Sequence, residues 1–449
     1  MVKTRVFSSV EIAKAIGGIH TGKEVKIDKV SIDSREHNEG MSCYFAILGK
    51  KYDGRNFINQ AIKNGAEIII TNKKIEAPVS AIYVNDTTKA LGMLGKYSAN
   101  GKKVIGITGS VGKTTTKELI SSILREKYSI VSTKGNNNNE IGVPLTLLEI
   151  KDHDYAIVEM GMRQQGEIRW LSYISRPCIS VITNIGNAHL ELLGSRENIF
   201  KAKTEILENT SYYAVVPFEE KFTQLNLKRP KLVYFGENSE YSIDKYEVEK
   251  NGIICSVKCK NKLINSISVK TYSVHNLSNI LSAIAVCDIC GVEEEDIRTG
   301  INKLPQIEKR GEIIKIADIV VINDSYNASF ESMKSAIYSL SEYAKVNNKK
   351  AVALLGDMLE IGDGAEEYHY RIGELCRDLG LENIFVYGKF SSCYIDGYIG
   401  GVRFVDRDKI AKSLISYLAN DTVLLVKASN SLKFFDIVKE MKELSYDGD

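Results

Sequence analysis

The nine residues from Thr108 to Thr116, which read Thr-Gly-Ser-Val-Gly-Lys-Thr-Thr-Thr, have the composition of a phosphate-binding loop. An apolar run at residues 104–107 precedes them, and an amphipathic run typical of a helix follows. Successive backbone N–H groups in such a loop can surround a phosphate, and the positive end of the helix dipole adds to the attraction. We therefore predict that Lys113 reaches the β- and γ-phosphates of a nucleoside triphosphate and that the Thr114 hydroxyl binds Mg²⁺. The predicted nucleotide-binding residues of the loop are Gly109, Ser110, Val111, Gly112, Lys113, Thr114 and Thr115.

The glycine spacing of this loop differs from the common form of the motif. In the Walker A pattern G-x-x-x-x-G-K-T the first glycine would stand where this chain has Ile107, and glycines occur instead at Gly106 and Gly109. The loop is thus a compact G-x-x-G-K-T form, which is less general than the Walker A. A glycine-rich turn without a ligand is the alternative, and the order strand, turn, Gly-Lys-Thr, helix argues against it.

Glu159 is a candidate metal ligand because it ends an apolar run at residues 155–159. Ligands of open α/β sheets bind at the carboxyl ends of the strands. A carboxylate there can hold Mg²⁺ beside Thr114. The alternative is an ordinary cap or ion pair at the end of a strand.

The elements that must position these residues alternate between strands and helices along the chain, which indicates α/β domains. With 449 residues, the chain exceeds the roughly 250–300 residues that one core supports, so two or three domains are expected. We predict a smaller α/β domain at 1–100, a central P-loop-type domain with a doubly wound parallel sheet at 101–309, and a Rossmann-like C-terminal domain at 310–449. Short alternating strands at 231–269 suggest an antiparallel piece appended to the central domain.

Composition excludes several other classes of function. The net charge of +2 gives no long-range attraction to nucleic acid or to an anionic membrane. No run approaches the roughly 18–20 apolar residues of a membrane helix, and residues 1–10 are not a signal peptide, so a cytosolic protein is expected. Eight cysteines in such a chain are expected to be free thiols, and the pairs Cys255/Cys259 and Cys287/Cys290 are interpreted as core residues rather than zinc ligands.

Motifs beyond the loop resemble those of the Mur ligase superfamily, to which folylpolyglutamate synthase also belongs, and the likeness runs essentially from end to end. The strings are Gly-Asn-Asn-Asn-Asn-Glu-Ile-Gly-Val-Pro at 135–144, Glu-Met-Gly at 159–161, Asn-Ala-His-Leu-Glu at 187–191, Lys-Ala-Lys at 201–203, His-Asn-x-x-Asn at 275–279, Asn-Asp-Ser-Tyr-Asn-Ala at 323–328 and Leu-Gly-Asp-Met-x-Glu-x-Gly at 355–362. The last two strings are most similar to the members that add a dipeptide rather than a single amino acid.

This resemblance implies a cytoplasmic step of peptidoglycan precursor synthesis. ATP would activate the terminal carboxylate of a UDP-N-acetylmuramoyl-tripeptide as an acyl phosphate, and the amine of D-alanyl-D-alanine would then displace phosphate. ATP and Mg²⁺ are the implied cofactors, a monomer is expected, and the third domain is expected to close over the reacting groups. The resemblance also leaves open a sister ligase that adds one amino acid, or a folylpolyglutamate synthase.

The resemblance also implies roles for residues that the spacing alone would not single out. It assigns His189 and a carbamylated Lys203 to a second Mg²⁺, although Lys203 by itself would be a solvated helix lysine paired with Glu205 or Glu208. Further implied contacts are adenine to Asn276 and Asn279, nucleotide phosphate to Arg310, ribose or water to Asp324, the UDP-sugar substrate to Ser34 and Arg35, and the dipeptide to Asn327 and Ser429. An ion pair at the domain interface is the alternative for Arg310 and Asp324.

Three positions depart from the family pattern. Ser273 replaces a glycine before the histidine of the 275–279 motif, and Arg55 replaces a histidine after an Asp-Gly pair. Ala428 replaces the glycine of a Lys-Gly-Ser string, which adds a methyl group where the backbone approaches a ligand.

Two other classes of protein are weaker alternatives. A regulatory GTPase would carry an Asn-Lys-x-Asp motif, which this chain lacks. A non-catalytic ATP-binding relative is disfavoured because Lys113, Thr114, Glu159, His189 and Lys203 are all present.

Overall fold

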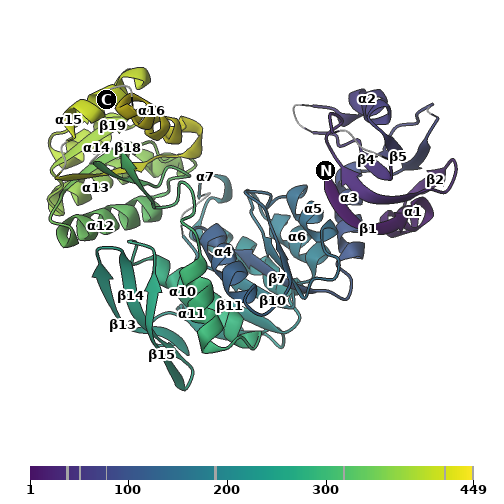
Figure 1. Ribbon diagram of the computed structural model, residues 1–449, viewed down its shortest axis with the longest axis horizontal. Coiled ribbons are helices and arrows are strands. Elements are labelled where there is room, and N and C mark those ends of the chain that lie inside the picture. The colour runs from purple at the N-terminus through teal and green to yellow at the C-terminus, as the bar shows by residue number, and fades with distance from the viewer. Residues whose placement is uncertain are drawn as a thin grey trace.

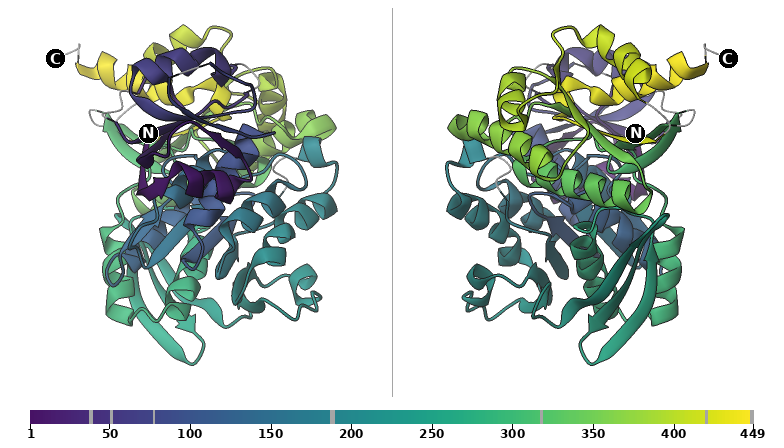
Figure 2. Two further views of the ribbon diagram at one scale, coloured as in Figure 1. Left: turned by 90° about the vertical axis from the view of Figure 1, so that its right-hand side faces the viewer. Right: turned by 90° about the vertical axis from the view of Figure 1, so that its left-hand side faces the viewer.

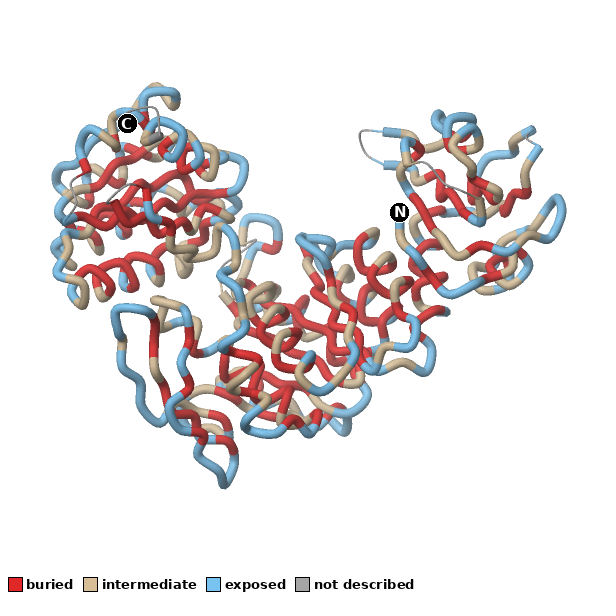
Figure 3. Tube along the Cα trace, viewed as in Figure 1, coloured by how far each residue is buried: buried red, intermediate tan, exposed pale blue. Residues whose placement is uncertain are grey.

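The computed structural model describes residues 1–36, 40–49, 52–76, 78–186, 190–316, 319–418 and 421–446. These residues form three units, each built around its own sheet. The first and third units stand at opposite ends of the longest axis, and the central unit joins them (Figure 1). The views along that axis show the three units in projection (Figure 2). Each unit has its own buried core (Figure 3), and the core of the first unit also includes Leu148 of the central unit.

The first unit is a six-stranded sheet of order β1-β3-β4-β5-β6-β2, in which β3 to β6 are parallel and the two outer strands are antiparallel to their neighbours. Helix α1 begins at a capping box, in which Ser8 and Glu11 each accept the other's backbone N–H. The elements are β1 (Val2–Ser8), α1 (Ser9–Ile16), β2 (Ile19–Thr21), β3 (Lys26–Ser31), β4 (Ser42–Phe45), the 3₁₀ helix η1 (Gly54–Phe57), α2 (Ile58–Lys63), β5 (Ala66–Thr71), β6 (Ser80–Tyr83) and α3 (Thr87–Ser98).

The central unit is a nine-stranded sheet of order β15-β14-β13-β12-β11-β10-β7-β9-β8. Helices cover both faces of its parallel part: α4, α10 and α11 contribute to one apolar core, and α5, α6 and α8 to the other. The elements are β7 (Lys103–Thr108), α4 (Lys113–Leu124), β8 (Ile130–Ser132), α5 (Gly142–Leu148), β9 (Tyr155–Glu159), α6 (Glu167–Ser175), β10 (Ile179–Ile182), α7 (Leu190–Leu193), α8 (Arg196–Thr204), η2 (Glu205–Asn209), β11 (Tyr213–Pro217), α9 (Glu220–Thr223), β12 (Lys231–Phe235), β13 (Tyr241–Glu249), β14 (Gly252–Cys259), β15 (Lys262–Val269), α10 (Asn276–Ile289) and α11 (Glu294–Lys303).

The antiparallel piece expected at 231–269 is smaller than predicted. Strand β12 is parallel to β11, so only β13, β14 and β15 are antiparallel, and they extend the central sheet instead of forming a separate one. Cys255, Cys259, Cys287 and Cys290 are buried free thiols of the core, which confirms the interpretation of both cysteine pairs.

The third unit is a six-stranded sheet of order β16-β17-β21-β18-β19-β20, parallel except for β16. Helices α12, α13 and α14 pack on one face, and α15 and α16 on the other. The elements are β16 (Glu312–Ile316), β17 (Ile319–Asn323), α12 (Phe330–Val346), β18 (Lys350–Gly356), η3 (Gly362–Gly364), α13 (Ala365–Asp378), β19 (Asn383–Tyr387), α14 (Ser391–Tyr398), β20 (Val402–Arg403), η4 (Arg407–Lys409), α15 (Ile410–Tyr417), β21 (Thr422–Lys427), η5 (Asn430–Leu432) and α16 (Phe434–Tyr446). The expected fold class, three α/β domains with a doubly wound central sheet, is confirmed.

Candidate functional site

The predicted phosphate loop lies between the end of β7 and the start of α4. Strand β7 pairs with β9 on one side and β10 on the other, so Glu159 and the residues after β10 flank the loop. Both loop glycines have backbone conformations that favour glycine, with φ of 152° at Gly109 and 82° at Gly112. A Cβ at Gly109 would come within 1.9 Å of Thr183 Oγ1, and one at Gly112 within 2.2 Å of Asn279 Oδ1. Close packing therefore requires glycine at both positions.

Four successive N–H groups at the start of α4 are available to an anion. The backbone amides of Gly112, Lys113, Thr114 and Thr115 have no acceptor in the part of the chain that the structure describes. They stand at the N-terminus of α4, where the helix dipole favours negative charge. Lys113 Nζ lies over the same loop and donates to the carbonyls of Gly109 at 2.7 Å and Ser110 at 3.2 Å. This arrangement fits a phosphate group.

Thr114 and Glu159 meet across the loop. Thr114 Oγ1 donates to Glu159 Oε2 at 2.9 Å, and Asn138 Nδ2 donates to the other carboxylate oxygen at 2.8 Å. Neighbouring ligands of an octahedral Mg²⁺ at about 2.1 Å from the ion are about 3 Å apart, which matches the separation of the hydroxyl and the carboxylate. No group of three His, Cys, Asp or Glu side chains among the described residues forms a metal site. Two protein oxygens with nucleotide phosphates and water are the usual environment of Mg²⁺, and these residues fit it.

The backbone of Glu159 is held by the strand beside it. Thr133 follows β8, and its hydroxyl accepts the Glu159 N–H at 3.0 Å. The Thr133 carbonyl in turn accepts from Lys117 Nζ at 2.7 Å. Lys117 is only 1% exposed and pairs with Glu118, so its charge is satisfied inside the fold. These bonds fix the end of β9 relative to α4, which carries Thr114.

Lys203 is buried close to the loop. The side chain is 1% exposed, so its amine is shielded from solvent. Burial lowers the pKa of Lys203 well below its ordinary value, and the charge of Lys113 lowers it further. Glu205, which the sequence suggested as a partner, instead accepts the backbone N–H groups of Gly166 and Arg169 at the start of α6. The interpretation of Lys203 as a solvated surface lysine is therefore wrong.

Charged groups from two units converge on Lys113. Burial lowers the pKa of the Lys113 amine; nearby Glu159 raises it, and the Arg310 guanidinium lowers it. Arg310 lies at the start of the third unit, where its guanidinium carbon stands 3.7 Å from the centre of the Tyr326 ring. The structure thus brings Thr114, Glu159, Lys113, Lys203 and Arg310 into one electrostatic neighbourhood.

Asn276 and Asn279 lie beside the loop at the start of α10. Asn279 Nδ2 donates to Asn276 Oδ1 at 3.0 Å, and Asn276 Nδ2 donates to Thr271 Oγ1 at 2.8 Å. Thr116 Oγ1, in the first turn of α4, donates to Asn279 Oδ1 at 3.3 Å. The two asparagines are therefore adjacent to the phosphate loop, as a nucleotide that spans both would require.

The predicted residues of the third unit gather at the carboxyl ends of β17 and β21. Lys427 is 2% exposed, and its amine donates to Asp324 Oδ2 at 2.7 Å and to the Asn327 carbonyl at 2.9 Å. Ser429 Oγ accepts the N–H of Leu359 at 2.9 Å. Helix α12 after β17 and helix α16 after β21 lie on opposite faces of the sheet, which is the arrangement that opens a ligand-binding crevice. Asp324 pairs with Lys427 and not with Arg310.

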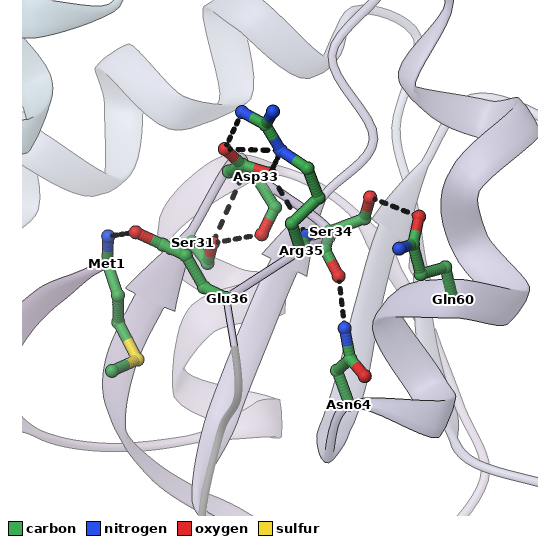
Figure 4. Close-up of polar contacts among 8 residues, drawn as sticks. All are labelled: Met1, Ser31, Asp33, Ser34, Arg35, Glu36, Gln60 and Asn64. Carbon is green, nitrogen blue, oxygen red and sulfur yellow. Dashed lines mark hydrogen bonds and ion pairs between the residues drawn. The ribbon is translucent and has the colours of Figure 1, made fainter.

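Ser34 and Arg35 belong to the first unit and are not brought to the loop. Ser34 Oγ donates to Gln60 Oε1 at 3.1 Å, and its carbonyl accepts from Asn64 Nδ2 at 2.8 Å (Figure 4). The Arg35 guanidinium lies on Asp33, with Nη2 2.6 Å from Oδ2, and these hydrogen bonds lower the pKa of Asp33 to about 2. The Arg35 side chain is 80% exposed, so it is accessible to a ligand.

His189 lies outside the described residues.

The structure also shows contacts that the sequence did not predict. They are made by Asn184, Thr133, Lys117 and Lys427, and by Asn138 of the 135–144 motif. Apart from the ion pair of Lys117 with the adjacent Glu118, their partners are 16 or more residues away along the chain, so no local spacing pattern could have found them. Within the described part of the chain, no helix is long and apolar enough to cross a membrane.

Comparisons with known proteins cover the chain from end to end. Residues 26–98 match the family description "Mur ligase family, catalytic domain", residues 107–287 match "Mur ligase middle domain", and residues 309–430 match "Mur ligase, glutamate ligase domain". The chain is 32% identical to the UDP-N-acetylmuramoyl-tripeptide–D-alanyl-D-alanine ligase of Bacillus subtilis, over 99% of both chains.

Solved structures agree with these matches. A MurF crystal structure from Acinetobacter baumannii superposes with a TM-score of 0.92 at 30% identity, covering 98% of this chain and 100% of the other. MurF from Thermotoga maritima in complex with ADP gives a TM-score of 0.85 at 27% identity, covering 94% and 98%. With the sequence motifs, the three-domain fold and these full-length matches in agreement, the chain belongs to the Mur ligase family.

Proposed function

We propose that the chain is an ATP-dependent ligase that joins D-alanyl-D-alanine to a UDP-N-acetylmuramoyl-tripeptide in peptidoglycan precursor synthesis. The observation that carries the proposal is the pairing of Thr114 with Glu159 beside four N–H groups that have no acceptor among the described residues, because this arrangement suits a Mg²⁺-bound nucleoside triphosphate. The choice of substrates is supported by the full-length similarity to ligases named for these substrates. ATP use is also supported by the ADP complex of the Thermotoga relative.

The chemistry consists of two transfers. A tripeptide carboxylate oxygen attacks the γ-phosphorus of ATP, the bond from that phosphorus to the bridging oxygen breaks, and ADP leaves with the electron pair. The amine of the dipeptide then attacks the acyl carbon, phosphate leaves, and the amine loses a proton. Catalysis of such transfers consists mainly of positioning and of stabilising negative charge.

The chain's own residues supply both. Lys113 and the N–H groups of residues 112–115 would bind the β- and γ-phosphates, and Arg310 would bind a phosphate from the third unit. Asn276 and Asn279 would contact adenine, and Asp324 the ribose or its water. Mg²⁺, held by Thr114 and Glu159, would supply further positive charge to the phosphates. His189 and Lys203 are proposed for a second Mg²⁺.

Lys203 is proposed to carry a carbamate. Its burial and lowered pKa favour the neutral amine, which is the form that attacks the carbon of CO₂; the adduct then loses a proton. The product is an anionic oxygen ligand in place of an ammonium group. Lys203→Ala should abolish activity, and added short-chain carboxylic acids should restore part of it. Lys201→Ala, the matched exposed lysine of α8, should keep full activity. Loss of activity in both variants, or none in either, would contradict the assignment.

The two outer domains are proposed to select the substrates. Ser34 and Arg35 would contact the UDP-sugar peptide, and Asn327 and Ser429 the dipeptide. The domain limits near residues 100 and 310 follow from the same assignment. We also propose a monomer that acts in the cytoplasm, where ATP and the nucleotide-linked precursor are available.

Phosphate release from purified protein tests the function directly. Reactions would contain ATP, Mg²⁺ and a UDP-N-acetylmuramoyl-tripeptide ending in diaminopimelate or lysine, with D-alanyl-D-alanine, single amino acids or glutamate as acceptor. We expect turnover with the dipeptide and one of the tripeptides. Turnover only with a single amino acid would indicate a sister ligase, and turnover with glutamate and a folate would indicate a folylpolyglutamate synthase.

A further inference from the structure

The segment that follows β10 is bound closely to the first half of the phosphate loop. Thr183 Oγ1 donates to the Val111 carbonyl at 2.5 Å, and the Gly186 N–H donates to Ser110 Oγ at 2.9 Å. A Cβ on residue 109 would overlap Thr183 Oγ1, so only glycine fits at this position. These contacts join residues 183–186 to residues 109–111 as one hydrogen-bonded assembly at the edge of the phosphate loop.

Asn184 makes the central contact of this assembly. Its side-chain oxygen accepts two backbone N–H groups, from Ser110 at 3.1 Å and from Val111 at 3.0 Å. Both partners are donors, so the carboxamide oxygen, and not its nitrogen, must face the loop. The Asn184 carbonyl also lies 3.2 Å from the Ser110 nitrogen, which strengthens the attachment.

This contact divides the N–H groups of the loop into two sets. Asn184 occupies those of Ser110 and Val111, while those of Gly112, Lys113, Thr114 and Thr115 stay free among the described residues. Without the Asn184 side chain, the Val111 N–H would lose its acceptor and the Ser110 N–H would keep only the main-chain carbonyl of residue 184, and unpaired backbone donors are costly. The loop would then rearrange, and the four free groups would lose their common orientation.

The charge of the side chain at position 184 also affects how the loop binds phosphate. An asparagine satisfies both N–H groups with a neutral oxygen. An aspartate could accept the same two bonds, but its charge would lie next to the nucleotide phosphates, where a like charge is repulsive. Asparagine therefore accepts both N–H groups of the loop without repelling the phosphates of the nucleotide.

We propose that Asn184 is a positioning residue for the phosphate loop, which sets the four N–H groups of residues 112–115 for nucleotide phosphates. The inference rests on the proposed binding of ATP by this loop. It assigns to Asn184 an effect on nucleotide affinity that is separate from the stability of the fold.

Three variants of the full-length protein test the proposal: Asn184→Leu, Asn184→Ala and Asn184→Asp. Asn209, a half-buried asparagine of the same domain that donates to Ser172 Oγ at 3.0 Å, supplies the control variants Asn209→Leu and Asn209→Asp. Affinity for fluorescent ADP with Mg²⁺, the KM values of all three substrates, and thermal unfolding would be measured for each. Two substitutions of different size keep the test usable if one of them does not fold.

The Leu and Ala variants should bind ADP about 10- to 100-fold more weakly, as expected when the Val111 N–H loses its acceptor and the Ser110 N–H loses one of two. Their KM for ATP should rise, while the KM values for the tripeptide and dipeptide stay near those of the natural protein. The Asp variant should unfold at the same temperature as the natural protein. It should still bind ADP poorly, because aspartate keeps the geometry of asparagine but carries a negative charge. The Asn209 variants should bind ADP normally.

Normal ADP affinity in the folded Leu and Ala variants would overturn the proposal, and so would equal rises in all three KM values. Normal ADP affinity in the Asp variant would show that Asn184 does not face the phosphates, which also overturns it. If the natural protein itself failed to bind ADP, the proposed function would fail together with this inference. Binding by the natural protein and by every variant would overturn only the inference about Asn184.

Discussion

Thr114 Oγ1 lies 2.9 Å from Glu159 Oε2, and this hydrogen bond joins the first turn of α4 to the end of β9. The two residues come from neighbouring strand–loop connections of the central sheet, because β7 and β9 are adjacent and parallel. Asn138 holds the second carboxylate oxygen, so the carboxylate has one fixed orientation toward the loop. A hydroxyl and a carboxylate placed in this way form one side of a Mg²⁺ site.

Replacing Glu159 by glutamine should impair the reaction through the metal. The amide keeps the shape of the side chain but loses its charge, so kcat should fall about 10²- to 10³-fold, as when other fixed electrostatic partners are removed. The Mg²⁺ concentration for half-maximal phosphate release should rise. Glu208→Gln, on the exposed face near Arg169, is the control and should keep normal Mg²⁺ dependence. An unchanged Mg²⁺ titration in Glu159→Gln would rule out the assignment.

Gly109→Ala should damage both the loop and the fold. Its Cβ would lie 1.9 Å from Thr183 Oγ1, and its φ of 152° is strained for any L side chain. We expect a loss of about 1–3 kcal/mol in the free energy of unfolding, together with a raised KM for ATP. Gly101→Ala, where φ is 76° and no atom lies within 4 Å of the new Cβ, controls for backbone strain alone. Equal KM values for ATP in the two variants would contradict the prediction.

Lys427→Met should leave the Asp324 carboxylate without its partner. The Lys427 amine is buried and lies 2.7 Å from that carboxylate, so its removal should cost about 3 kcal/mol of stability. Chemical denaturation measures the loss, and Lys439→Met, at an exposed site, should change little. The double variant Lys427→Met with Asp324→Asn should regain part of the stability, because no unpaired charge remains. A double variant that is less stable than the single one would show that the pair does not act as proposed.

The third domain should lose stability in mild acid through His369. This side chain is fully buried; its Nε2 accepts the Met358 N–H at 2.9 Å, and its Nδ1 lies 2.5 Å from the Ala365 carbonyl. Burial lowers the pKa of His369 below its value in the unfolded chain, so the unfolded state binds the proton more readily. Stability from this group is complete above the unfolded pKa of about 6.5 and falls at lower pH, by up to about 1.4 kcal/mol per pH unit.

His369→Gln should weaken this pH dependence, because glutamine can accept the Met358 N–H and does not titrate. Denaturation curves at about pH 5 and about pH 7 compare the two proteins, and hydrogen exchange of the Met358 amide reports the local effect. If stability fell equally in both proteins on acidification, His369 would not be the group responsible.

The three domains should draw together when substrates bind. Asp324 and Asn327 belong to the third unit, Ser34 and Arg35 to the first, and these units stand at opposite ends of the molecule (Figure 1). An acyl phosphate must be kept from water, which requires the site to close. Small-angle scattering should give a smaller radius of gyration with a non-hydrolysable ATP analogue and the tripeptide than without them. Equal radii in the two conditions would count against closure.

Local sequence was sufficient for the phosphate loop and for Glu159. Both depend on short patterns, a Gly-Lys-Thr turn after an apolar strand and a carboxylate at a strand end, and the structure places both as expected. The same patterns did not reveal the burial of Lys203, because a lysine in a polar helix looks solvated until the packing around it is known. Nor did they show that β12 continues the parallel sheet, since strand direction depends on the connection and not on the strand's own residues.

By itself, the sequence determined the class of domains, the phosphate loop and the family, because these depend on residue type and spacing along the chain. Tertiary structure alone decided which side chains serve the loop. Asn138 reaches Glu159, Asn184 reaches Ser110 and Val111, and Lys427 reaches Asp324 only because parallel strands bring their carboxyl ends to one edge of a sheet. The electrostatic state of Lys203 was decided in the same way, because a pKa is set by burial and by neighbouring charges that the linear order does not specify.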